Sequence, residues 1–243
     1  MQLALIRVMK IALIGYGKMG ESIDLMASEM GIEVVSRIDP TSERANFSSL
    51  TYESVEQADV CIDFSHPLSV VQNIAALCSF EKQIVVGTTG WEASRKIVEG
   101  LVKNSGVGLV YGDNFSVGVH FFTEIARAVA KRLHAYTEYS PSLTEIHHQK
   151  KVDRPSGTAL WIDRILREEG VNLSDLASVR CGSVPGTHTL LLDGIDDSIT
   201  ITHTARSRNG FSRGALKAAE WIRSRQGLYS VSDMLNESMT QIL

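Results

Sequence analysis

The stretch that decides the fold of this chain is "KIALIGYGKMG", residues 10–20. It is an apolar run that ends in glycine and leads directly into a helical pattern. Such a run is typical of a strand that is buried on both faces. Gly15, Gly17 and Gly20 have the spacing G-x-G-x-x-G, and this spacing between a strand and a helix indicates a dinucleotide-binding turn.

Each part of this turn has a physical reason. Gly15 permits a tight turn, Gly17 lets a pyrophosphate approach the backbone, and Gly20 lets the helix pack on the strand. Asp39 follows about 20 residues later, where a carboxylate can bind the adenosine ribose. The alternative is an ordinary tight turn beside a solvated aspartate. We predict nucleotide contacts from Gly15, Tyr16, Gly17, Lys18, Met19, Gly20 and Asp39.

Strand and helix patterns alternate outward from this turn. Further strands are expected at residues 33–39, 58–65, 83–90 and 106–112, with helices at 18–31, 68–78 and 92–102. This alternation is typical of a parallel sheet wrapped by helices.

Two loops that follow strands in this pattern are further candidates for the nucleotide site. Ligands of such sheets bind beyond the carboxyl ends of the strands. The loops "GTTG" (87–90) and "GDNFS" (112–116) therefore add Gly87, Thr88, Thr89, Gly112, Asp113, Asn114 and Phe115, unless they are ordinary connections.

The pattern changes after about residue 114. A long amphipathic helix is expected over 117–136, with Phe121, Ile125, Val129 and Leu133 four apart. Strand-like segments follow at 137–148 and 177–184, and a hairpin around "GIDD" joins 187–194 to 198–205. Helices are expected at 156–170, 213–225 and 231–239. The fold class is therefore α/β: a Rossmann-type parallel-sheet domain over 1–113, completed by a C-terminal return over 212–243, and a mixed α+β domain over 114–211.

The composition excludes several classes of protein. A net charge of −4 argues against nucleic acid as the main partner, and the chain has no apolar run long enough to span a membrane. The apolar start of the chain is not predicted to be a signal peptide. The expected location is the cytoplasm. Translation could begin at Met9, which would make residues 1–8 an extension. Cys61, Cys78 and Cys181 lack ligand or disulfide spacing and are expected to be reduced thiols packed inside the protein.

Titratable residues are concentrated in "EIHHQKKVDRPSGTAL", residues 145–160. Ser156 is the expected N-cap of a helix, and free amides around Gly157 and Thr158 would form a cradle for a carboxylate. A His-His pair is more often structural, but Lys151 and the helix start favour a site for an anion. The histidines outside this segment, at 66, 120, 134, 188 and 203, have no partner at metal-ligand spacing, so no metal site is predicted.

The segments "IGYGKMG", "DFSHP", "VGTTG", "NFSVG" and "EIHHQKKVDRPSGTA" together resemble the dihydrodipicolinate reductase family. The resemblance implies reduction of 4-hydroxy-tetrahydrodipicolinate, a cyclic imine with two carboxylates, by NADH or NADPH on the diaminopimelate route to lysine. It also implies a homotetramer formed through the mixed domain, which would bind the substrate. It implies that His147 is the general acid, that Lys151 is a fixed charge and second proton donor, and that His148, Ser156, Gly157 and Thr158 bind substrate. A histidine suits proton donation at neutral pH.

Two features differ from the family pattern. Tyr16 stands where a small residue is common, and it would either crowd the pyrophosphate or point away. The segment 40–57 is short, which leaves less room for adenosine contacts. We expect NADH to be preferred, since Asp39 would repel the 2′-phosphate of NADPH unless Arg37 or Arg44 compensates.

Several roles and alternatives stay open. Asp153 is expected to fix the loop and Lys150 to be solvated, while Arg206 and Arg208 reach either substrate or an interface. The alternative functions are a related amino-acid dehydrogenase and a non-catalytic nucleotide-binding sensor.

Overall fold

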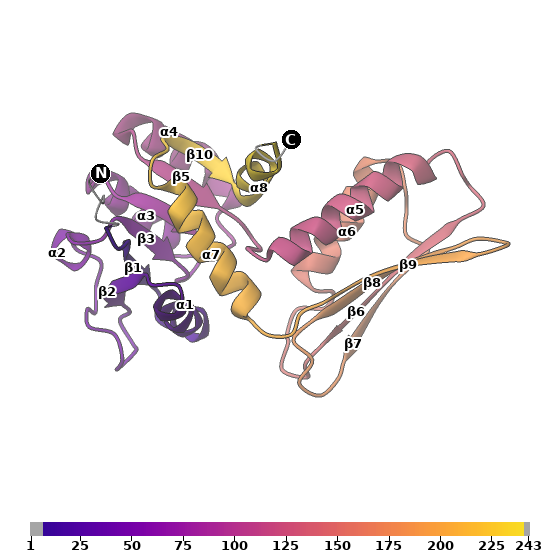
Figure 1. The fold of residues 1–243 in the computed structure, drawn as a ribbon, viewed down its shortest axis with the longest axis horizontal. Coiled ribbons are helices and arrows are strands. Elements are labelled where there is room, and N and C mark those ends of the chain that lie inside the picture. Colours follow the sequence, from indigo (N-terminus) through magenta and orange to yellow (C-terminus); the bar gives the residue numbers. More distant parts are fainter. Residues whose placement is uncertain (1–6, 241–243) are drawn as a thin grey trace, which may run out of the picture. The chain divides into compact units, whose positions relative to one another are not determined.

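The computed structural model describes residues 7–240, which form two units (Figure 1). The first unit consists of the chain up to Ser116 together with the chain from Phe211 onward, and the second is Val117–Gly210. The hypothesis of an extension over residues 1–8 falls mostly on residues 1–6, which lie outside the described residues.

The first unit contains a six-stranded sheet in the order β10-β5-β4-β3-β1-β2, in which every neighbouring pair is parallel. Its strands are β1 (Lys10–Ile14), β2 (Glu33–Ile38), β3 (Val60–Asp63), β4 (Gln83–Val86), β5 (Gly108–Tyr111) and β10 (Gly227–Ser230). The predicted parallel sheet is confirmed. The strand order reverses between β1 and β3, which is the place where ligands of such sheets bind.

Strand β10 was not predicted, because the C-terminal return shows only helical patterns in the sequence. It has four residues and pairs with β5, Gly227 opposite Gly108. A strand this short carries no periodicity of its own, so its identity depends on the neighbouring strand.

Helices cover both faces of this sheet. They are α1 (Lys18–Glu29), α2 (Tyr52–Val55), α3 (Val70–Ser79), the 3₁₀ turn η1 (Glu92–Ser94), α4 (Arg95–Ser105), α7 (Asn209–Ile222) and α8 (Val231–Thr240). Buried residues of α1, α7 and α8 share one core with β1, while those of α2, α3 and α4 share the core on the opposite face. The two cores hold the carboxyl ends of β1 to β5 in fixed positions.

The second unit is a four-stranded sheet in the order β7-β6-β8-β9. Its strands are β6 (Ser140–His147), β7 (Asp175–Arg180), β8 (Thr187–Asp193) and β9 (Ser198–Thr204). β7 runs parallel to β6, and the other pairs are antiparallel. The predicted mixed sheet and the hairpin from β8 to β9 are both confirmed.

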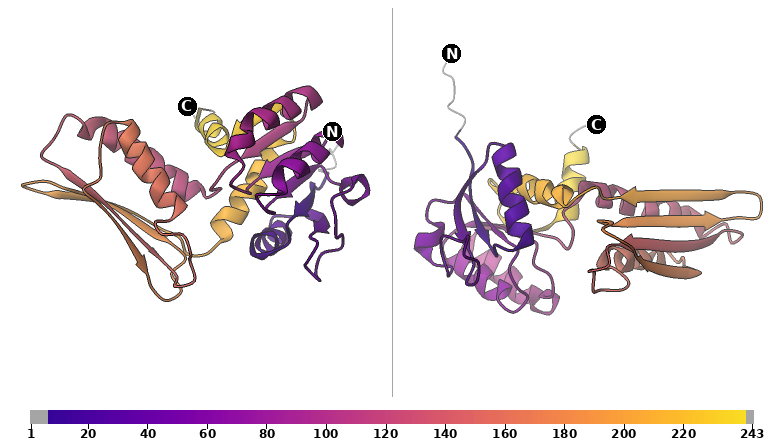
Figure 2. Two further views of the ribbon diagram at one scale, coloured as in Figure 1. Left: turned by 180° about the vertical axis from the view of Figure 1, so that it is seen from behind. Right: turned by 90° about the horizontal axis from the view of Figure 1, so that it is seen from below.

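Two helices, α5 (Val117–Leu133) and α6 (Gly157–Glu168), lie side by side on one face of this sheet (Figures 1 and 2). Phe122 and Ala126 of α5 pack with Ile162 of α6 and with Leu143 and Leu190 of the strands. This packing sets the position of the first residues of α6 over one end of the sheet.

The buried face of α5 differs from the expected one. Phe121 is 49% exposed and Ile125 47% exposed, while Phe122, Ala126 and Ala130 are buried. Both sets have helical spacing, and the alanines let α6 approach closely, which larger side chains would prevent. The helix also ends at Leu133 rather than at residue 136.

Within residues 7–240, no helix combines the length and the hydropathy that crossing a membrane requires. The three cysteines are free thiols. Cys61 and Cys78 are buried, as expected, but Cys181 is exposed, so the prediction of a packed thiol is wrong for Cys181. Burial raises the pKa of Cys61 to about 12, so this thiol is not reactive at neutral pH.

Candidate active site

The glycine turn after β1 has two closed positions and one open position. A Cβ on Gly15 (φ +86°) would lie 2.3 Å from the carbonyl oxygen of Phe64, and a Cβ on Gly20 would lie 2.4 Å from that of Gly15. Apart from its chain neighbours, no described residue has an atom within 4 Å of the corresponding position on Gly17, which is also the N-cap of α1. The backbone at Gly17 can therefore be approached by a ligand, and a pyrophosphate fits this turn.

Tyr16 points away from this open position. Its ring is buried in the core of the first unit, and its hydroxyl donates a hydrogen bond to Asp24. Burial, together with that bond to a carboxylate, raises the pKa of Tyr16. Lys18 is exposed and Met19 half-buried in the first turn of α1. Of the two positions considered for Tyr16, the one that crowds the phosphate is therefore excluded.

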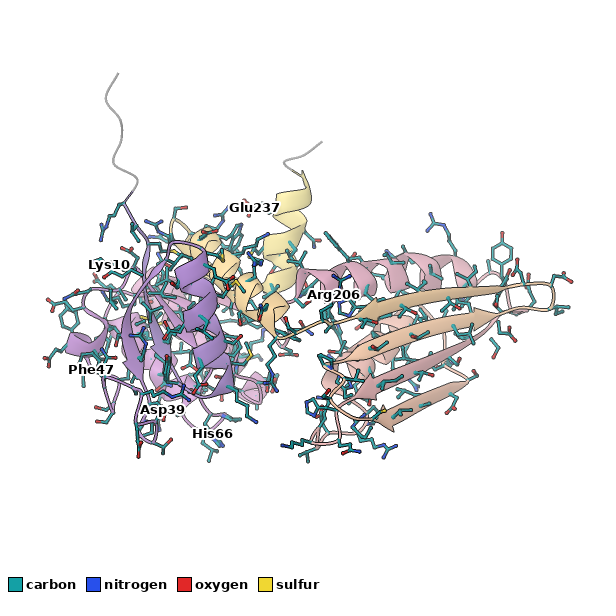
Figure 3. All side chains as sticks on the ribbon, turned by 60° about the horizontal axis from the view of Figure 1, so that its bottom comes forward. Lys10, Asp39, Phe47, His66, Arg206 and Glu237 are labelled. Atoms are coloured by element: carbon teal, nitrogen blue, oxygen red, sulfur yellow. The ribbon has the colours of Figure 1, made fainter. Side chains whose placement is uncertain are left out.

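Asp39 follows β2 in the first unit (Figure 3), and the backbone around it already binds its carboxylate. Its carboxylate accepts hydrogen bonds of 2.8–2.9 Å from the amides of Tyr16, Thr41 and Ser42 and from the Thr41 hydroxyl. Burial by itself would raise the pKa of Asp39, but these bonds outweigh it and lower the pKa. An ionised Asp39 therefore lies beside a shallow cavity of about 310 Å³ that residues 39–43 and 45–48 line.

The loop after β4 is tied to Asp63, a buried carboxylate at the end of β3. Asp63 accepts hydrogen bonds from Thr88 Oγ1 (2.6 Å), Ser65 Oγ (2.7 Å) and Asn73 Nδ2 (2.8 Å). The hydroxyl of Thr88 is thus used to hold this loop to Asp63, whereas the side chain of Thr89 is exposed. Gly87 is required here, because a Cβ would overlap the ring of Phe64.

The loop after β5 is similar. Phe115 and Asn114 are buried, and the Phe115 ring lies 5.9 Å from that of Phe64. Gly112 donates a hydrogen bond to the carbonyl of Val86, and Asp113 is exposed. These loops can present backbone and exposed groups to a ligand, while their buried side chains hold the loops in place.

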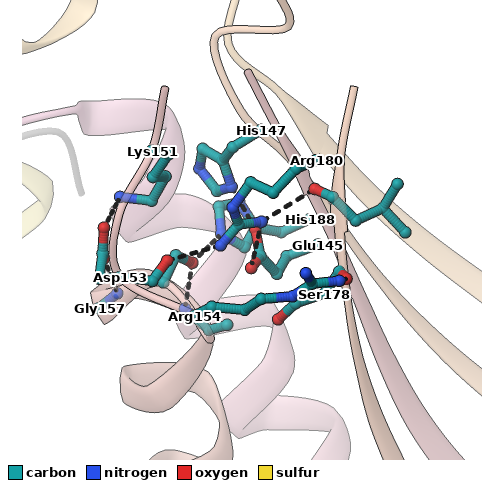
Figure 4. Close-up of polar contacts among 12 residues, drawn as sticks. Glu145, His147, Lys151, Asp153, Arg154, Gly157, Ser178, Arg180 and His188 are labelled. Carbon is teal, nitrogen blue, oxygen red and sulfur yellow. Dashed lines mark hydrogen bonds and ion pairs between the residues drawn. The ribbon is translucent and has the colours of Figure 1, made fainter. Parts of the chain in front are cut away.

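In the second unit, β6 carries two titratable residues on its buried face (Figure 4). Its burial alternates along the strand, so Glu145 and His147 continue the face that begins with Pro141 and Leu143. Glu145 Oε2 contacts Nδ1 of His147, and Glu145 Oε1 lies 2.9 Å from Nη1 of Arg180 on β7. The nitrogen Nε2 of His147 is on the far side of the ring, next to Gly186.

The interpretation that His188 has no partner at metal-ligand spacing is wrong, because its ring lies beside Glu145 and His147. Strand pairing places His188 opposite Glu145, and its ring packs edge-on against that of His147, 5.2 Å between centroids. His188 Nε2 lies 3.0 Å from Oγ of Ser156. Burial, with the neighbouring His147, lowers the pKa of His188 to about 4. The spacing rule missed this contact because pairing between strands does not depend on distance along the chain.

The loop between β6 and α6 holds the remaining predicted residues. Ser156 is the N-cap of α6, as expected, since its Oγ accepts a hydrogen bond of 3.2 Å from Ala159. The amide of Gly157 is not free, contrary to the prediction: it donates to Asp153 Oδ2 at 3.3 Å. Asp153 Oδ1 also lies 2.8 Å from Nζ of Lys151, so Asp153 fixes the loop.

The other residues of this segment lie nearer the surface. His148 and Thr158 are half-buried, whereas Lys150 is exposed, as expected for a solvated lysine. Arg206 and Arg208 are exposed after β9.

Burial and charge set the protonation of the two residues on β6. Burial would raise the pKa of Glu145, but hydrogen bonds with Ser178, Arg180 and His147 outweigh it and lower the pKa. Burial lowers the pKa of His147, and the nearby Glu145 opposes this only in part. The resting site therefore holds an ionised Glu145 and a neutral His147 that carries its proton on Nδ1.

The donor atoms of Glu145, His147 and His188 lie within 4.8 Å of one another, a spacing that a metal ion could use. However, Glu145 already bonds His147, and the Arg180 guanidinium supplies a positive charge at the carboxylate. A dication here would be repelled by Arg180. The three residues are therefore better suited to proton transfer than to metal binding.

Glu145, Arg180 and Asp63 were not predicted as site residues. The only local signal is a titratable residue at a buried strand position, which Glu145 occupies within the alternation of "SLTEIH".

Two family models match the chain. One, described as dihydrodipicolinate reductase, N-terminus, matches residues 9–115, and the other, dihydrodipicolinate reductase, C-terminus, matches residues 118–235. The 4-hydroxy-tetrahydrodipicolinate reductases of Christiangramia forsetii and Staphylococcus carnosus are each 33% identical over 94% of this chain and cover 98% and 100% of their own lengths.

Solved structures share the fold. A dipicolinate-bound dihydrodipicolinate reductase from Paenisporosarcina sp. TG-14 superposes with a TM-score of 0.76 at 20% identity, over 92% of this chain and 97% of its own. A probable dehydrogenase from Thermotoga maritima gives 0.61 at 11% identity, over 93% and 92%. Sequence and fold agree: the chain belongs to the dihydrodipicolinate reductase family, whose members are pyridine-nucleotide-dependent oxidoreductases.

Proposed function

We propose that His147 is the proton donor in the reduction of 4-hydroxy-tetrahydrodipicolinate, the reaction that this chain catalyses on the diaminopimelate route to lysine. The observation that carries this proposal is the contact between His147 Nδ1 and Glu145, which leaves Nε2 as the nitrogen that exchanges a proton with substrate. A bound pyridine nucleotide supplies the hydride. After the 4-hydroxyl and a hydrogen of the neighbouring ring carbon have left as water, the hydride would add to the ring carbon that is conjugated to the imine. His147 would then give a proton from Nε2 to the carbon next to it, so a C–H bond forms, the N–H bond breaks, and the imidazole becomes neutral.

The charge of the substrate prepares His147 for this step. The pKa of His147 is lowered by burial in the resting site, but an opposite charge nearby favours the protonated form. The two carboxylates of the substrate therefore raise the pKa of His147 on binding. His147 is thus charged mainly when substrate is present.

We assign substrate binding to the second unit, through Lys151, His148, Ser156, Gly157 and Thr158. Lys151 offers a positive charge and a second proton, and Gly157 offers an amide at the helix start. Asp153 already bonds both Lys151 and Gly157, so a substrate carboxylate would replace it at these two donors. Ser156 contributes by capping α6, since its hydroxyl is engaged with Ala159 and His188.

We assign nucleotide binding to the first unit, at the glycine turn, Asp39 and the loops 87–89 and 112–115. The open position at Gly17 and the ionised Asp39 support this assignment. Among these residues, Tyr16, Thr88 and Phe115 would act by shaping their loops, because their side chains are buried.

NADH is the preferred cofactor in this proposal. The carboxylate of Asp39 opposes a 2′-phosphate, and both nearby arginines are already paired. Arg37 makes a two-point contact with Asp24 at 2.6 and 2.9 Å, and Arg44 lies 2.5 Å from Glu21. Neither cation is available without breaking an ion pair. Assembly into a tetramer and a cytoplasmic location stay predictions.

The test is a coupled assay, in which a synthase makes the substrate from pyruvate and aspartate semialdehyde and the loss of NADH absorbance is followed. Oxidation that depends on the substrate supports the proposal, whereas binding of NADH without turnover would indicate a nucleotide sensor. Turnover of an amino acid and its oxo acid instead would indicate an amino-acid dehydrogenase. Comparison of kcat/KM for NADH and NADPH tests the preference. The ratio of the NADH value to the NADPH value should be smaller in Asp39→Ala than in the wild type.

A further inference from the structure

Glu145 occupies an unusual place for a carboxylate. It is 0% exposed, on the strand face that it shares with Leu143, and its cross-strand neighbour is His188. Moving a carboxylate out of water costs several kcal/mol unless it is paired and hydrogen-bonded. An apolar side chain at this position would continue the core of the second unit at less cost, so the carboxylate calls for an explanation other than packing.

Both oxygens of Glu145 have a defined neighbour. Oε2 contacts His147 Nδ1, and Oε1 lies 2.9 Å from Nη1 of Arg180. Arg180 also donates from Nη2 to the carbonyl of Asp153 at 2.6 Å, in the loop that carries Lys151. The carboxylate is therefore bound to the imidazole on one side and, through Arg180, to the loop on the other (Figure 4).

The contact at Nδ1 determines what the rest of the imidazole can do. A carboxylate accepts a hydrogen bond and cannot donate one, so neutral His147 must carry its hydrogen on Nδ1. Its Nε2 then has an open lone pair, and a second proton can be taken up and released only there. A Cβ on Gly186 would lie 2.9 Å from Nε2, so the absence of a side chain at Gly186 keeps the space beside Nε2 open.

We propose that Glu145 is a positioning residue that fixes the tautomer and the orientation of His147, with Arg180 keeping Glu145 ionised. This inference rests on the proposed role of His147 as proton donor. The new element is that proton donation depends on two residues. Glu145 does not contact the substrate, yet removal of its negative charge should impair His147.

The charges around His147 come from every neighbouring element. Glu145 on β6 is the negative group, while Arg180 on β7, His188 on β8 and Lys151 in the loop are positive or can become so. If Glu145 lost its charge, the three other groups would remain, and each of them disfavours a protonated imidazole. The pKa of His147 should then fall further, and its proton should be harder to supply.

The first measurement needs no variant. Nitrogen-15 NMR of the histidine side chains in the unliganded protein, above neutral pH, should show His147 with hydrogen on Nδ1. Assignment comes from His147→Asn, whose spectrum lacks that signal. Hydrogen on Nε2 in the wild type would overturn the proposal.

The second measurement uses Glu145→Gln, which keeps the shape and removes the charge, with Glu168→Gln as the matched control. Glu168 is the last residue of α6, at the opposite end of the helix from Gly157, and its half-exposed carboxylate pairs with Arg127 of α5. Glu168→Gln should therefore leave kcat unchanged. Glu145→Gln should lower kcat roughly 10- to 100-fold. It should also move the pH profile of kcat/KM to lower pH and change substrate KM and NADH Kd less than about threefold. Glu145→Asp, which restores the charge, should recover part of kcat and of the profile.

An unchanged pH profile and kcat in folded Glu145→Gln would contradict the role. If Glu145→Gln does not fold, Glu145→Asp and the wild-type tautomer decide the question. Failure of the underlying function is recognised separately, because His147→Ala would then keep its activity whatever the tautomer is.

Discussion

Glu145 and His147 lie two positions apart on the buried face of β6, with the carboxylate of Glu145 in contact with Nδ1 of His147. The alternation of a strand puts the two side chains on one face. The neighbouring strands then add Arg180 from one side and His188 from the other. A proton-donor site thus arises from ordinary strand geometry, at the end of the sheet where α6 begins.

The glycine turn gives a prediction that separates binding from folding. Gly17→Ala should fold normally, because its Cβ meets open space, and should raise the NADH Kd at least tenfold, because it occupies the space of a phosphate. Gly20→Ala should lower Tm instead, since its Cβ would strike the backbone of Gly15, at a cost of about 1–3 kcal/mol. NADH titration and thermal unfolding measure the two effects. A Gly17→Ala variant that binds NADH like the wild type would place the pyrophosphate elsewhere.

The start of α6 gives a second prediction. Apart from its chain neighbours and the nearby backbone of α6, no described residue has an atom within 4 Å of a Cβ on Gly157, so Gly157→Val should fold without a clash. It should raise the substrate KM about tenfold or more, because the side chain fills the space that a carboxylate needs, and leave the NADH Kd unchanged. Gly100→Val on α4, another open position, is the control and should leave KM alone. An unchanged KM in Gly157→Val would make the helix start purely structural.

The buried His188 predicts how stability depends on pH. The pKa of His188 is about 4 in the folded protein, whereas an ordinary histidine, as in the unfolded chain, has a pKa of 6.5. The unfolded chain therefore takes up the proton first as the pH falls. Stability is therefore lost from about pH 6.5 down to about pH 4, by up to about 1.4 kcal/mol per pH unit. His188→Asn should flatten this slope in urea unfolding experiments. Equal slopes in the two proteins would show that His188 is not the group that titrates.

Local features of the site could be predicted from the sequence, and long-range ones could not. The turn at Gly15 and the cap at Ser156 depend on residues a few positions away, so their patterns are visible in the chain. Arg180 and His188 reach Glu145 only through strand pairing, and β10 exists only beside β5. These contacts depend on register, which the sequence alone does not determine.

The faces of elements were the other source of error. The helical spacing of Phe121 and Ile125 is real, but the neighbouring face with Phe122 and Ala126 is the one that α6 covers. Similarly, the amide of Gly157 was expected to be free because a helix start has unpaired donors, and Asp153 satisfies it instead. In both cases the sequence allows two local arrangements, and a contact with another residue or helix determines which one forms.

The most direct test of the account is kcat of His147→Ala and Lys151→Ala, measured with saturating NADH and freshly made substrate, alongside the NADH Kd of each variant. General acid catalysis contributes roughly 10²- to 10⁴-fold, so each variant should lose most of kcat by about that factor. Both should bind NADH like the wild type, because the nucleotide is assigned to the first unit. Activity within about threefold of the wild type in both variants would contradict the proposed site.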